Sequence, residues 1–245
     1  MRRLRWSLAK RVARLNPRLR TLDRLGARWE LDPRDWLDLR LIIGQPFEAA
    51  QRARFAALLA EHRPPVLFDV GANFGLYAVL MAQAAPWLRV EAFEPVPRTR
   101  VKLERNLALN ALTDRVRVHP LAASDAAGEA QIAVDPRSSG LSTLSPSAAE
   151  TARRDYAETL TIRTARLDDL FPGPPGPFAL KLDVEGHEPA ALAGMTRLLA
   201  EAPSGVAQIE IRRRNADAVR AAMTAAGWRE IDRIEDELYF AKTPA

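Results

Sequence analysis

The sequence predicts an α/β fold, in which a doubly wound and mostly parallel sheet ends in an antiparallel hairpin. From residue 66 onward, short apolar runs alternate with helical patterns, as is typical of parallel strands joined by crossover helices. The first run leads directly into the glycine-containing turn 71–75, as expected at the ligand-binding edge of such a sheet. The last two apolar runs lie too close together for a parallel crossover, which needs about a dozen residues, and so they form a hairpin.

Composition limits the class of protein. The 245 residues, of which 47% are hydrophobic, suffice for one large domain with a buried core and an appendage. The absence of cysteine excludes disulfides, thiolate metal sites and a cysteine nucleophile. No apolar run approaches the roughly 18 residues of a membrane span, and no apolar segment follows the basic N-terminus as in a secretory signal. We therefore expect a cytoplasmic protein.

Positive charge is concentrated in the first 28 residues. They contain ten Arg or Lys residues and one acid, Asp23, for a net charge of +9, whereas the rest of the chain has 26 basic and 30 acidic residues and carries −4. Apolar residues recur here every three or four positions, which predicts an amphipathic helix that Pro17 divides into two pieces. These apolar residues are Leu4, Leu8, Val12, Leu15, Leu19 and Leu22.

Two interpretations of this basic helix are open from the sequence. It either packs on the body as a solvated helix or rests on anionic lipid or another polyanion. The second interpretation brings residues 1–28 into peripheral contact with the inner membrane surface. Nucleic acid is a less favoured partner, because the body of the chain lacks basic charge. We assign residues 1–60 to a basic N-terminal helical extension and residues 61–245 to the sheet domain.

The elements up to residue 134 follow from local signals. A helix over Ala49–His62 ends before Pro64-Pro65. Val66–Val70 is an apolar run between proline and glycine, as in a buried parallel strand. The alternation then continues with a helix over Leu76–Ala85, a strand over Arg89–Phe93, a helix over Pro97–Asn110, a strand over Val116–Leu121 and a short extra strand over Gly128–Val134.

The second half repeats this alternation after an irregular segment. Arg137–Ala149 is rich in Ser, Ala and Pro, which predicts a mobile excursion. The elements that follow are a strand over Leu160–Ala165, a strand over Phe178–Val184, a helix over about 189–200, a strand over Val206–Ile211, a helix over Ala216–Ala226 with Gly227 as its C-cap, and the hairpin strands Trp228–Ile231 and Leu238–Lys242.

The turn 71–75 indicates a ligand site. Gly71 and Gly75 allow the backbone to turn sharply and to approach a ligand, and the next helix begins with free N–H groups. Glycines between a strand and a helix can also serve only to make the turn tight, but Glu94 favours the interpretation that this turn binds a ligand. It ends the second strand 19 residues after Gly75, where a carboxylate can accept two hydrogen bonds from a ribose diol. These residues predict a cofactor that contains adenosine.

The chemistry of the turn favours S-adenosylmethionine over a dinucleotide. The turn reads G-A-N-F-G and lacks the G-x-G-x-x-G spacing that lets a pyrophosphate approach the helix. Asp69, just ahead of the turn, would repel phosphates and attract an ammonium or sulfonium group. S-adenosylmethionine has an adenosine, an α-amino group and a sulfonium, and so it meets these requirements better than NAD does.

Five segments carry a resemblance to a known enzyme family. They are FDVGANFGLYAVL (68–80), AFEPVP (92–97), PLAASDAAGEAQI (120–132), TARLDDL (164–170) and LKLDVEGHEPAALAG (180–194). In this order they resemble the FkbM-type family of class I S-adenosylmethionine-dependent methyltransferases, over roughly residues 40–243. The resemblance implies a Rossmann-like seven-stranded sheet. It also implies O-methylation of a hydroxyl on a sugar, on a glycolipid or polysaccharide unit, or on a secondary metabolite.

The resemblance also assigns the cofactor site residue by residue. The methionine part falls to Asp69, Gly71, Asn73 and Gly75, the ribose to Glu94, and the adenine edge to Ser124 and Asp125.

The segment KLDVEGHE (181–188) supplies candidates for the acceptor side. Methyl transfer needs the acceptor oxygen to be held in line, and a hydroxyl benefits from a base that takes its proton. Strand alternation places Lys181, Asp183 and Glu185 on one side. We assign Asp183 to orienting the acceptor and Glu185 to accepting its proton, with His187 as a third catalytic candidate. Alternatively, Lys181 and Asp183 form a buried ion pair that braces the strand.

Other functions are weighed against this one. An RNA methyltransferase recruited by the basic helix is weaker, because the sequence has no N-P-P-Y-type motif for base methylation. A non-catalytic cofactor-binding scaffold would not need the intact segment 181–188, and a nicotinamide dehydrogenase is disfavoured by the glycine spacing. We expect no metal, since a divalent ion between Asp183 and Glu210 has no dense ligand cluster to support it.

Overall fold

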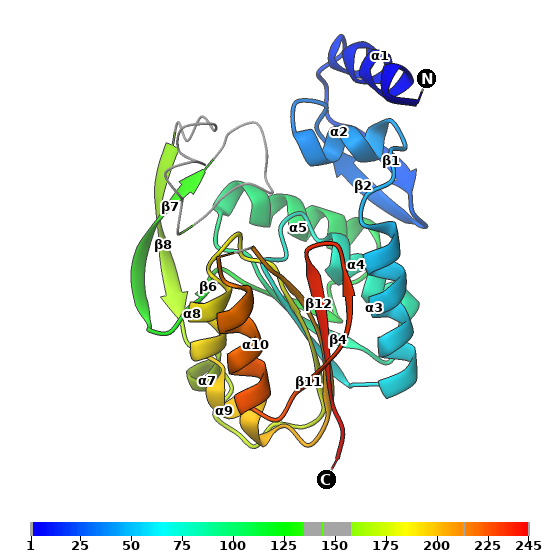
Figure 1. Ribbon diagram of the computed structural model, residues 1–245. Helices are drawn as coiled ribbons and strands as arrows, with labels where there is room; N and C mark the ends of the chain where they lie inside the picture. Colours follow the sequence, from blue (N-terminus) through cyan, green and yellow to red (C-terminus); the bar gives the residue numbers. More distant parts are fainter. Residues whose placement is uncertain (1, 135–143, 145–157, 213, 245) are drawn as a thin grey trace.

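The structure is a computed structural model that describes residues 2–134, 144, 158–212 and 214–244 (Figure 1). Its centre is a seven-stranded sheet with the strand order β11-β12-β10-β9-β3-β4-β5. The parallel strands are β3 (Val66–Val70), β4 (Arg89–Phe93), β5 (Val116–His119), β9 (Phe178–Leu182) and β10 (Gly205–Glu210). At the other edge, β11 (Arg229–Ile234) and β12 (Glu237–Lys242) form the antiparallel hairpin. The predicted fold class is confirmed.

Helices cover both faces of this sheet. One face is covered by α3 (Ala49–His62), α4 (Leu76–Ala84) and α5 (Pro97–Leu109), and the other by α8 (Glu188–Ala193), α9 (Thr196–Glu201) and α10 (Ala216–Ala225) (Figure 1). Because the sheet is covered on both faces, its central strands are apolar runs, and all five residues of β9 are buried. The single helix predicted over 189–200 is divided into α8 and α9 at Gly194-Met195.

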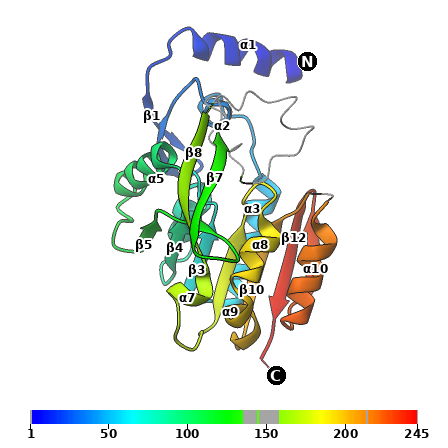
Figure 2. The same cartoon turned by 90° about the vertical axis from the view of Figure 1, so that its left-hand side faces the viewer.

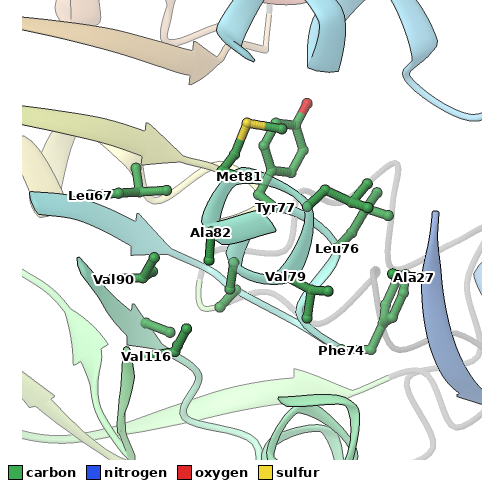
Figure 3. Packing of buried hydrophobic residues seen from close by; sticks show 14 of the residues in the cluster. Ala27, Leu67, Phe74, Leu76, Tyr77, Val79, Met81, Ala82, Val90 and Val116 are labelled. Atoms are coloured by element: carbon green, nitrogen blue, oxygen red, sulfur yellow. The ribbon is translucent and has the colours of Figure 1, made fainter. Parts of the chain in front are cut away.

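Helix α4 lies at the centre of the larger core. It is apolar on every side, and residues 76–82 are all buried. Figure 3 shows α4 between Leu67 and Val90 of the sheet and the N-terminal segment, where Phe74 points toward Ala27. The N-terminal segment therefore belongs to the same core as the sheet.

The N-terminal segment is helical only in part. Helix α1 (Arg2–Arg14) agrees with the prediction, but after Pro17 the chain forms a hairpin of β1 (Arg20–Arg24) and β2 (Ala27–Leu31), followed by α2 (Trp36–Ile42). The prediction of a second helical piece is wrong, because Leu19 and Leu22 precede a tight turn and not a helix. Leu25 and Gly26 both have positive φ, 56° and 81°, as a two-residue hairpin turn requires.

The hairpin is attached to the sheet domain by buried contacts. Trp29 is completely buried, and its ring packs edge-on against Phe74 with 5.6 Å between the centroids. The backbone N–H of Glu30 donates to Asn106 Oδ1 at 2.8 Å. The boundary proposed between residues 60 and 61 falls inside α3, whose Phe55 lies in the shared core.

A smaller sheet stands beside the central one. Its strands are β6 (Ala122–Ala123), β8 (Glu158–Ala165) and β7 (Gly128–Val134), in that order. Figure 2 shows β7 and β8 side by side, and their pairing is antiparallel. The short helix α7 (Leu167–Leu170) then leads toward β9. The excursion predicted over Arg137–Ala149 lies outside the described residues, apart from Leu144.

None of the helices within the described part of the chain combines the length and the apolar composition that a membrane span requires.

Gly71 marks a close approach between the turn after β3 and the end of β9. Its φ is +85°, and a Cβ at this position would collide with the backbone oxygen of Asp183. We expect Gly71→Ala to lower the free energy of unfolding by about 2–5 kcal/mol. Alanine is strained at this positive φ, and its Cβ would displace the backbone at Asp183 after β9. Urea denaturation measures the change. Gly176→Ala is the control, since no atom lies within 4 Å of a Cβ there. Equal stabilities for the two variants would contradict the prediction.

Candidate functional site

The candidate site lies at the carboxyl edge of the central sheet. Strands β3, β4 and β5 follow one another toward one edge of the sheet, and the later strand β9 pairs with the other side of β3. Ligands of doubly wound sheets bind where the strand order reverses in this way. A cavity of about 270 Å³ is found at this reversal. Its walls come from the ends of β3, β4 and β9, from β6, and from residues 36–48 of the N-terminal segment.

The turn after β3 forms one wall of the cavity. The N–H groups of Gly71 and Ala72 both donate to the backbone oxygen of Phe93, at 3.1 and 3.0 Å, and so β4 fixes the turn. Asp69, Gly71 and Asn73, which the sequence predicts to bind the cofactor, all line the cavity. Gly75 is not in the lining. It precedes α4 with a φ of +95°, a Cβ there would meet Leu103, and its part in cofactor binding stays a prediction.

Two buried oxygens at this wall have no hydrogen-bond partner within the described part of the chain. They are Asp69 Oδ2 and Asn73 Oδ1. Burial raises the pKa of Asp69 to about 7, although the ammonium group of Lys181 opposes the shift. Buried acceptors are nearly always satisfied, because an unsatisfied one costs about 1–3 kcal/mol. A ligand that brings N–H or O–H donors therefore fits this wall.

Glu94 is buried at the end of β4 and braces the turn. Its Oε2 accepts the N–H of Asn73 at 3.0 Å, and its Oε1 accepts the N–H of Val96 at 2.8 Å. Burial raises its pKa to about 7 in spite of these hydrogen bonds. Each carboxylate oxygen keeps a second lone pair, so Glu94 can brace the turn and accept ligand hydroxyls at the same time. The sequence predicts the second role but not the first.

Ser124 and Asp125 lie beside the cavity and outside its lining, which is formed here by residues 121–123. Ser124 is buried, and its Oγ is hydrogen-bonded to His187 Nε2 at 3.0 Å and to Asp125 Oδ1 at 3.1 Å. Asp125 is exposed. Their contact with adenine stays a prediction, and the structure gives Ser124 a further contact that orients His187.

The acceptor-side candidates gather around the end of β9. This strand ends at Leu182, and Glu185 and Gly186 have positive φ, 55° and 103°, so the strand alternation predicted through Glu185 stops early. Even so, Asp183 and Glu185 come together with Glu210, with carboxylate oxygens within 4.8 Å of one another. The expectation that no dense cluster surrounds Asp183 and Glu210 is wrong, because β10 runs parallel to β9 and brings Glu210 alongside.

Cations neutralise part of this carboxylate cluster (Asp183, Glu185 and Glu210). Lys181 Nζ lies 3.3 Å from Asp183 Oδ2 and 3.1 Å from Glu237 Oε1. Burial lowers the pKa of Lys181, but these carboxylates outweigh it and raise the pKa well above its usual value. Glu185 is ion-paired with Arg212. Two of the three carboxylates are thus already paired with a cation of the protein. This favours a role for the cluster in accepting a proton over a role in binding a metal cation.

Glu210 is the member of the cluster best suited to hold a proton. Burial raises its pKa well above the usual value, and the carboxylates of Asp183 and Glu185 add to the shift. Its Oε2 is buried and has no hydrogen-bond partner among the residues described. Since like charges at this distance cannot all be ionised cheaply, the neighbouring carboxylates favour the protonated form of Glu210.

The loop after β9 is held by its own side chains. Glu188 Oε1 accepts the N–H groups of Val184 and Gly186, at 3.2 and 2.9 Å, which fixes the loop that carries Glu185. His187 lines the cavity. Burial lowers its pKa, and so the ring is neutral near pH 7 and can act as a hydrogen-bond partner of an acceptor.

The sequence did not reveal one wall of the site. Trp36, Phe47 and Glu48 line the cavity although they precede the first strand of the central sheet, β3, by at least eighteen residues. Burial raises the pKa of Glu48, which is hydrogen-bonded to Tyr77, another lining residue. Glu48 has a φ of +46° at the start of α3 and makes no capping hydrogen bond there. A glutamate in place of a Ser, Thr or Asp cap is the local signal that could have marked it.

Comparison with known proteins is consistent with this geometry. The sequence model of the family described as "Methyltransferase FkbM domain" matches residues 69–238. Methyltransferase sdnD of Sordaria araneosa is 35% identical over 122 residues, which are 49% of this chain and 44% of that protein. Hexuronic acid methyltransferase AglP of Haloferax volcanii is 35% identical over 139 residues, which are 55% of this chain and 51% of that protein. The chain thus spans about half the length of these curated relatives.

Among solved structures, a methyltransferase FkbM from Methylobacillus flagellatus KT has a TM-score of 0.51 at 18% identity, over 73% of this chain and 43% of that one. This likeness concerns the fold, and it agrees with a Rossmann-like arrangement of the sheet and its helices.

The buried carboxyl of Asp69 makes the stability of the ligand-free protein depend on pH. Its pKa is about 7 in the fold and near 3.8 in an unfolded chain, so the folded state binds this proton more tightly. The contribution to stability is complete below about pH 4 and is lost as the pH rises through 7. We expect the free energy of unfolding to fall less between pH 5 and pH 8 in Asp69→Asn than in the unchanged protein, measured by urea denaturation.

Asp217→Asn serves as the control for this experiment, because Asp217 is an exposed acid on α10. If Asp69→Asn kept the same pH dependence as Asp217→Asn, Asp69 would not be the group responsible.

Proposed function

The chain belongs to the FkbM methyltransferase family, and we propose that it uses S-adenosylmethionine to methylate a hydroxyl group of a sugar-containing acceptor. Membership of the family makes the protein a methyltransferase. The cofactor and the acceptor are our proposal, and one observation carries it. The braced turn after β3 and the carboxylate cluster after β9 line the same cavity.

The residues after β3 and β4 fit the cofactor. Asp69 and Asn73 offer buried oxygens without donors, which suit the amino group of the methionine part, and Glu94 has lone pairs for the ribose hydroxyls. When bound, S-adenosylmethionine supplies a methyl carbon activated by a positive sulfur. Asp69 favours such a positively charged ligand over a dinucleotide, whose phosphates it would repel.

The carboxylate cluster favours a hydroxyl as the acceptor. Even with the counter-charges of Lys181 and Arg212, the cluster presents carboxylates that disfavour an anionic oxygen, whereas a neutral hydroxyl can donate a hydrogen bond to one of them and lose its proton to the cluster. Lys181 holds Asp183 in place, so Asp183 is suited to orienting the hydroxyl. Glu185 accepts the proton in our proposal, and Glu210 can take it on, because burial and the neighbouring carboxylates raise the pKa of Glu210.

The wall from the N-terminal segment supports a sugar as the acceptor. Trp36 and Phe47 present flat apolar ring faces, and Glu48 presents a carboxylate that can accept from hydroxyl groups. The relative AglP is described as a hexuronic acid methyltransferase. For an acceptor that has both a carboxylate and hydroxyls, the negative charge of the cluster directs the methyl group to a hydroxyl.

Two measurements test the proposal. Calorimetric titration with S-adenosylhomocysteine should show binding, and NAD should show none. Transfer of a labelled methyl group from S-adenosylmethionine to a panel of hexuronic acids and neutral sugars should give an ether, which resists alkali. An alkali-labile ester, or the failure of S-adenosylhomocysteine to bind, would overturn the proposal.

Glu94 is the residue whose change should weaken the cofactor most selectively. Glu94→Gln keeps the shape of the side chain but loses the charge, and so it should raise the Kd for S-adenosylhomocysteine at least about tenfold. Calorimetry measures the affinity, and urea denaturation measures how much of the bracing at Asn73 is lost. Glu104→Gln on the exposed side of α5 is the matched control. Equal affinity in the two variants would remove Glu94 from the cofactor site.

The carboxylate cluster should control turnover and its dependence on pH. We expect Glu185→Gln to lower kcat about 100-fold or more while affinity for S-adenosylhomocysteine is unchanged, because proton removal contributes at least about that factor. In the unchanged protein, kcat should rise with pH as Glu210, whose pKa is raised well above its usual value, loses its proton and becomes able to take one from Glu185. Glu210→Gln cannot titrate, and so this rise should be lost.

Steady-state kinetics over a range of pH measures both effects. Unaltered kcat in Glu185→Gln would exclude it as proton acceptor, and an unmoved pH profile in Glu210→Gln would show that Glu210 is not coupled to the reacting group.

A further inference from the structure

The end of α1 and the residues after it form an exposed surface that is both apolar and basic. Val12, Leu15 and Leu19 are 59%, 83% and 53% exposed, and they are among the most exposed large apolar side chains of the described residues. Arg11, Arg14 and Arg18 each directly precede one of them in the sequence and are also exposed. We call these six residues the docking surface. Isolated exposed apolar residues are ordinary, but a group of them interleaved with arginine is not.

The arginines of this surface differ from their neighbours further along the chain. Arg20 donates to the backbone oxygens of Ala13 and Asn16, and Arg24 donates to those of Leu41 and Ile42, so these two hold the segment together. Within the described part of the chain, no acidic side chain forms an ion pair with an arginine of the docking surface. The charge of this surface therefore faces solvent or a partner.

The docking surface is connected to the cavity through α2. Lys10 Nζ lies 5.8 Å from the ring centroid of Trp36, and the Arg40 guanidinium lies 4.9 Å from the same ring and 4.8 Å from that of Phe47. Trp36 and Phe47 line the cavity, and Trp36 is 42% exposed. In Figures 1 and 2, α1 lies outside α2 at one end of the molecule. What binds to this surface is thus held at the rim of the site.

We propose that the docking surface rests on an anionic lipid membrane and that the hydroxyl acceptor is presented to the cavity from that membrane. An interfacial segment buries its apolar side chains below the headgroups while its cations meet anionic lipids, and this surface supplies both. Nucleic acid would use the arginines but would leave Val12, Leu15 and Leu19 in water. The statement about the acceptor rests on the proposed function, whereas the statement about the membrane does not.

Sedimentation with lipid vesicles tests the proposal on the full chain. The protein should sediment with vesicles of phosphatidylcholine mixed with phosphatidylglycerol, but not with phosphatidylcholine alone, and added salt should weaken the binding. Combined Arg11→Glu, Arg14→Glu and Arg18→Glu should reduce partitioning at least about 100-fold. Combined Leu15→Ser and Leu19→Ser should reduce it with the charge unchanged.

The matched control reverses three exposed arginines elsewhere, through Arg117→Glu, Arg163→Glu and Arg229→Glu. It should retain vesicle binding, and all the variants should bind S-adenosylhomocysteine like the unchanged protein. Failure of the unchanged protein to bind anionic vesicles would overturn the proposal. So would equal losses in the control, or tight binding of an RNA oligonucleotide that Leu15→Ser and Leu19→Ser leave unaffected. Because vesicle binding is measured without the cofactor, its failure is distinguishable from failure of the methyl transfer.

Discussion

A buried ammonium group, that of Lys181, is the interaction on which the candidate site depends. It lies in the central strand β9 and contacts Asp183, just after that strand, and Glu237 on β12, while its Nζ lies 5.0 Å from the ring centroid of Tyr77 on α4. Removing one partner of a buried ion pair leaves an uncompensated charge, which is far more costly than the pair itself. Lys181 therefore couples the hairpin edge, a cavity wall and the carboxylate cluster, and its positive charge opposes the rise in pKa that burial gives to Asp69 and Glu237.

The two sides of the cavity are built in different ways. On the cofactor side, backbone groups form the wall, and β4 fixes them through the oxygen of Phe93 and the carboxylate of Glu94. On the acceptor side, side chains converge because β9 and β10 are in parallel register, which sets Glu210 beside Asp183. The first side is held by hydrogen bonds within the fold. The second side brings together carboxylates that raise the pKa of Glu210, and this is the group to which our proposal passes the proton.

This difference explains what the sequence could and could not predict. Asp69, Gly71 and Glu94 are recognisable because a strand, a tight turn and the next strand are consecutive in the chain, and local residue types determine them. The contact of Glu210 with the cluster needs strand order and register, which no local pattern contains. Trp36 and Glu48 were missed because their place also depends on tertiary contacts. The packing of the β1–β2 hairpin against Phe74 positions the N-terminal segment so that these residues line the cavity.

The basic charge of residues 1–28 and the acidic charge of the rest of the chain are related to the position of the carboxylate cluster. A methyltransferase site with a carboxylate cluster gives its surroundings negative potential, and residues 29–245 carry a net charge of −4. Such a body is repelled by an anionic surface, with an energy that decays over about 10 Å at moderate ionic strength. Lys181 and Arg212 are already paired with carboxylates of the cluster, so the basic residues that could meet an anionic surface lie outside the cavity. In our proposal a separate segment of charge +9, attached at the rim through α2, offsets this repulsion from outside the cavity. The distribution of charge is thus consistent with the proposed docking on an anionic membrane.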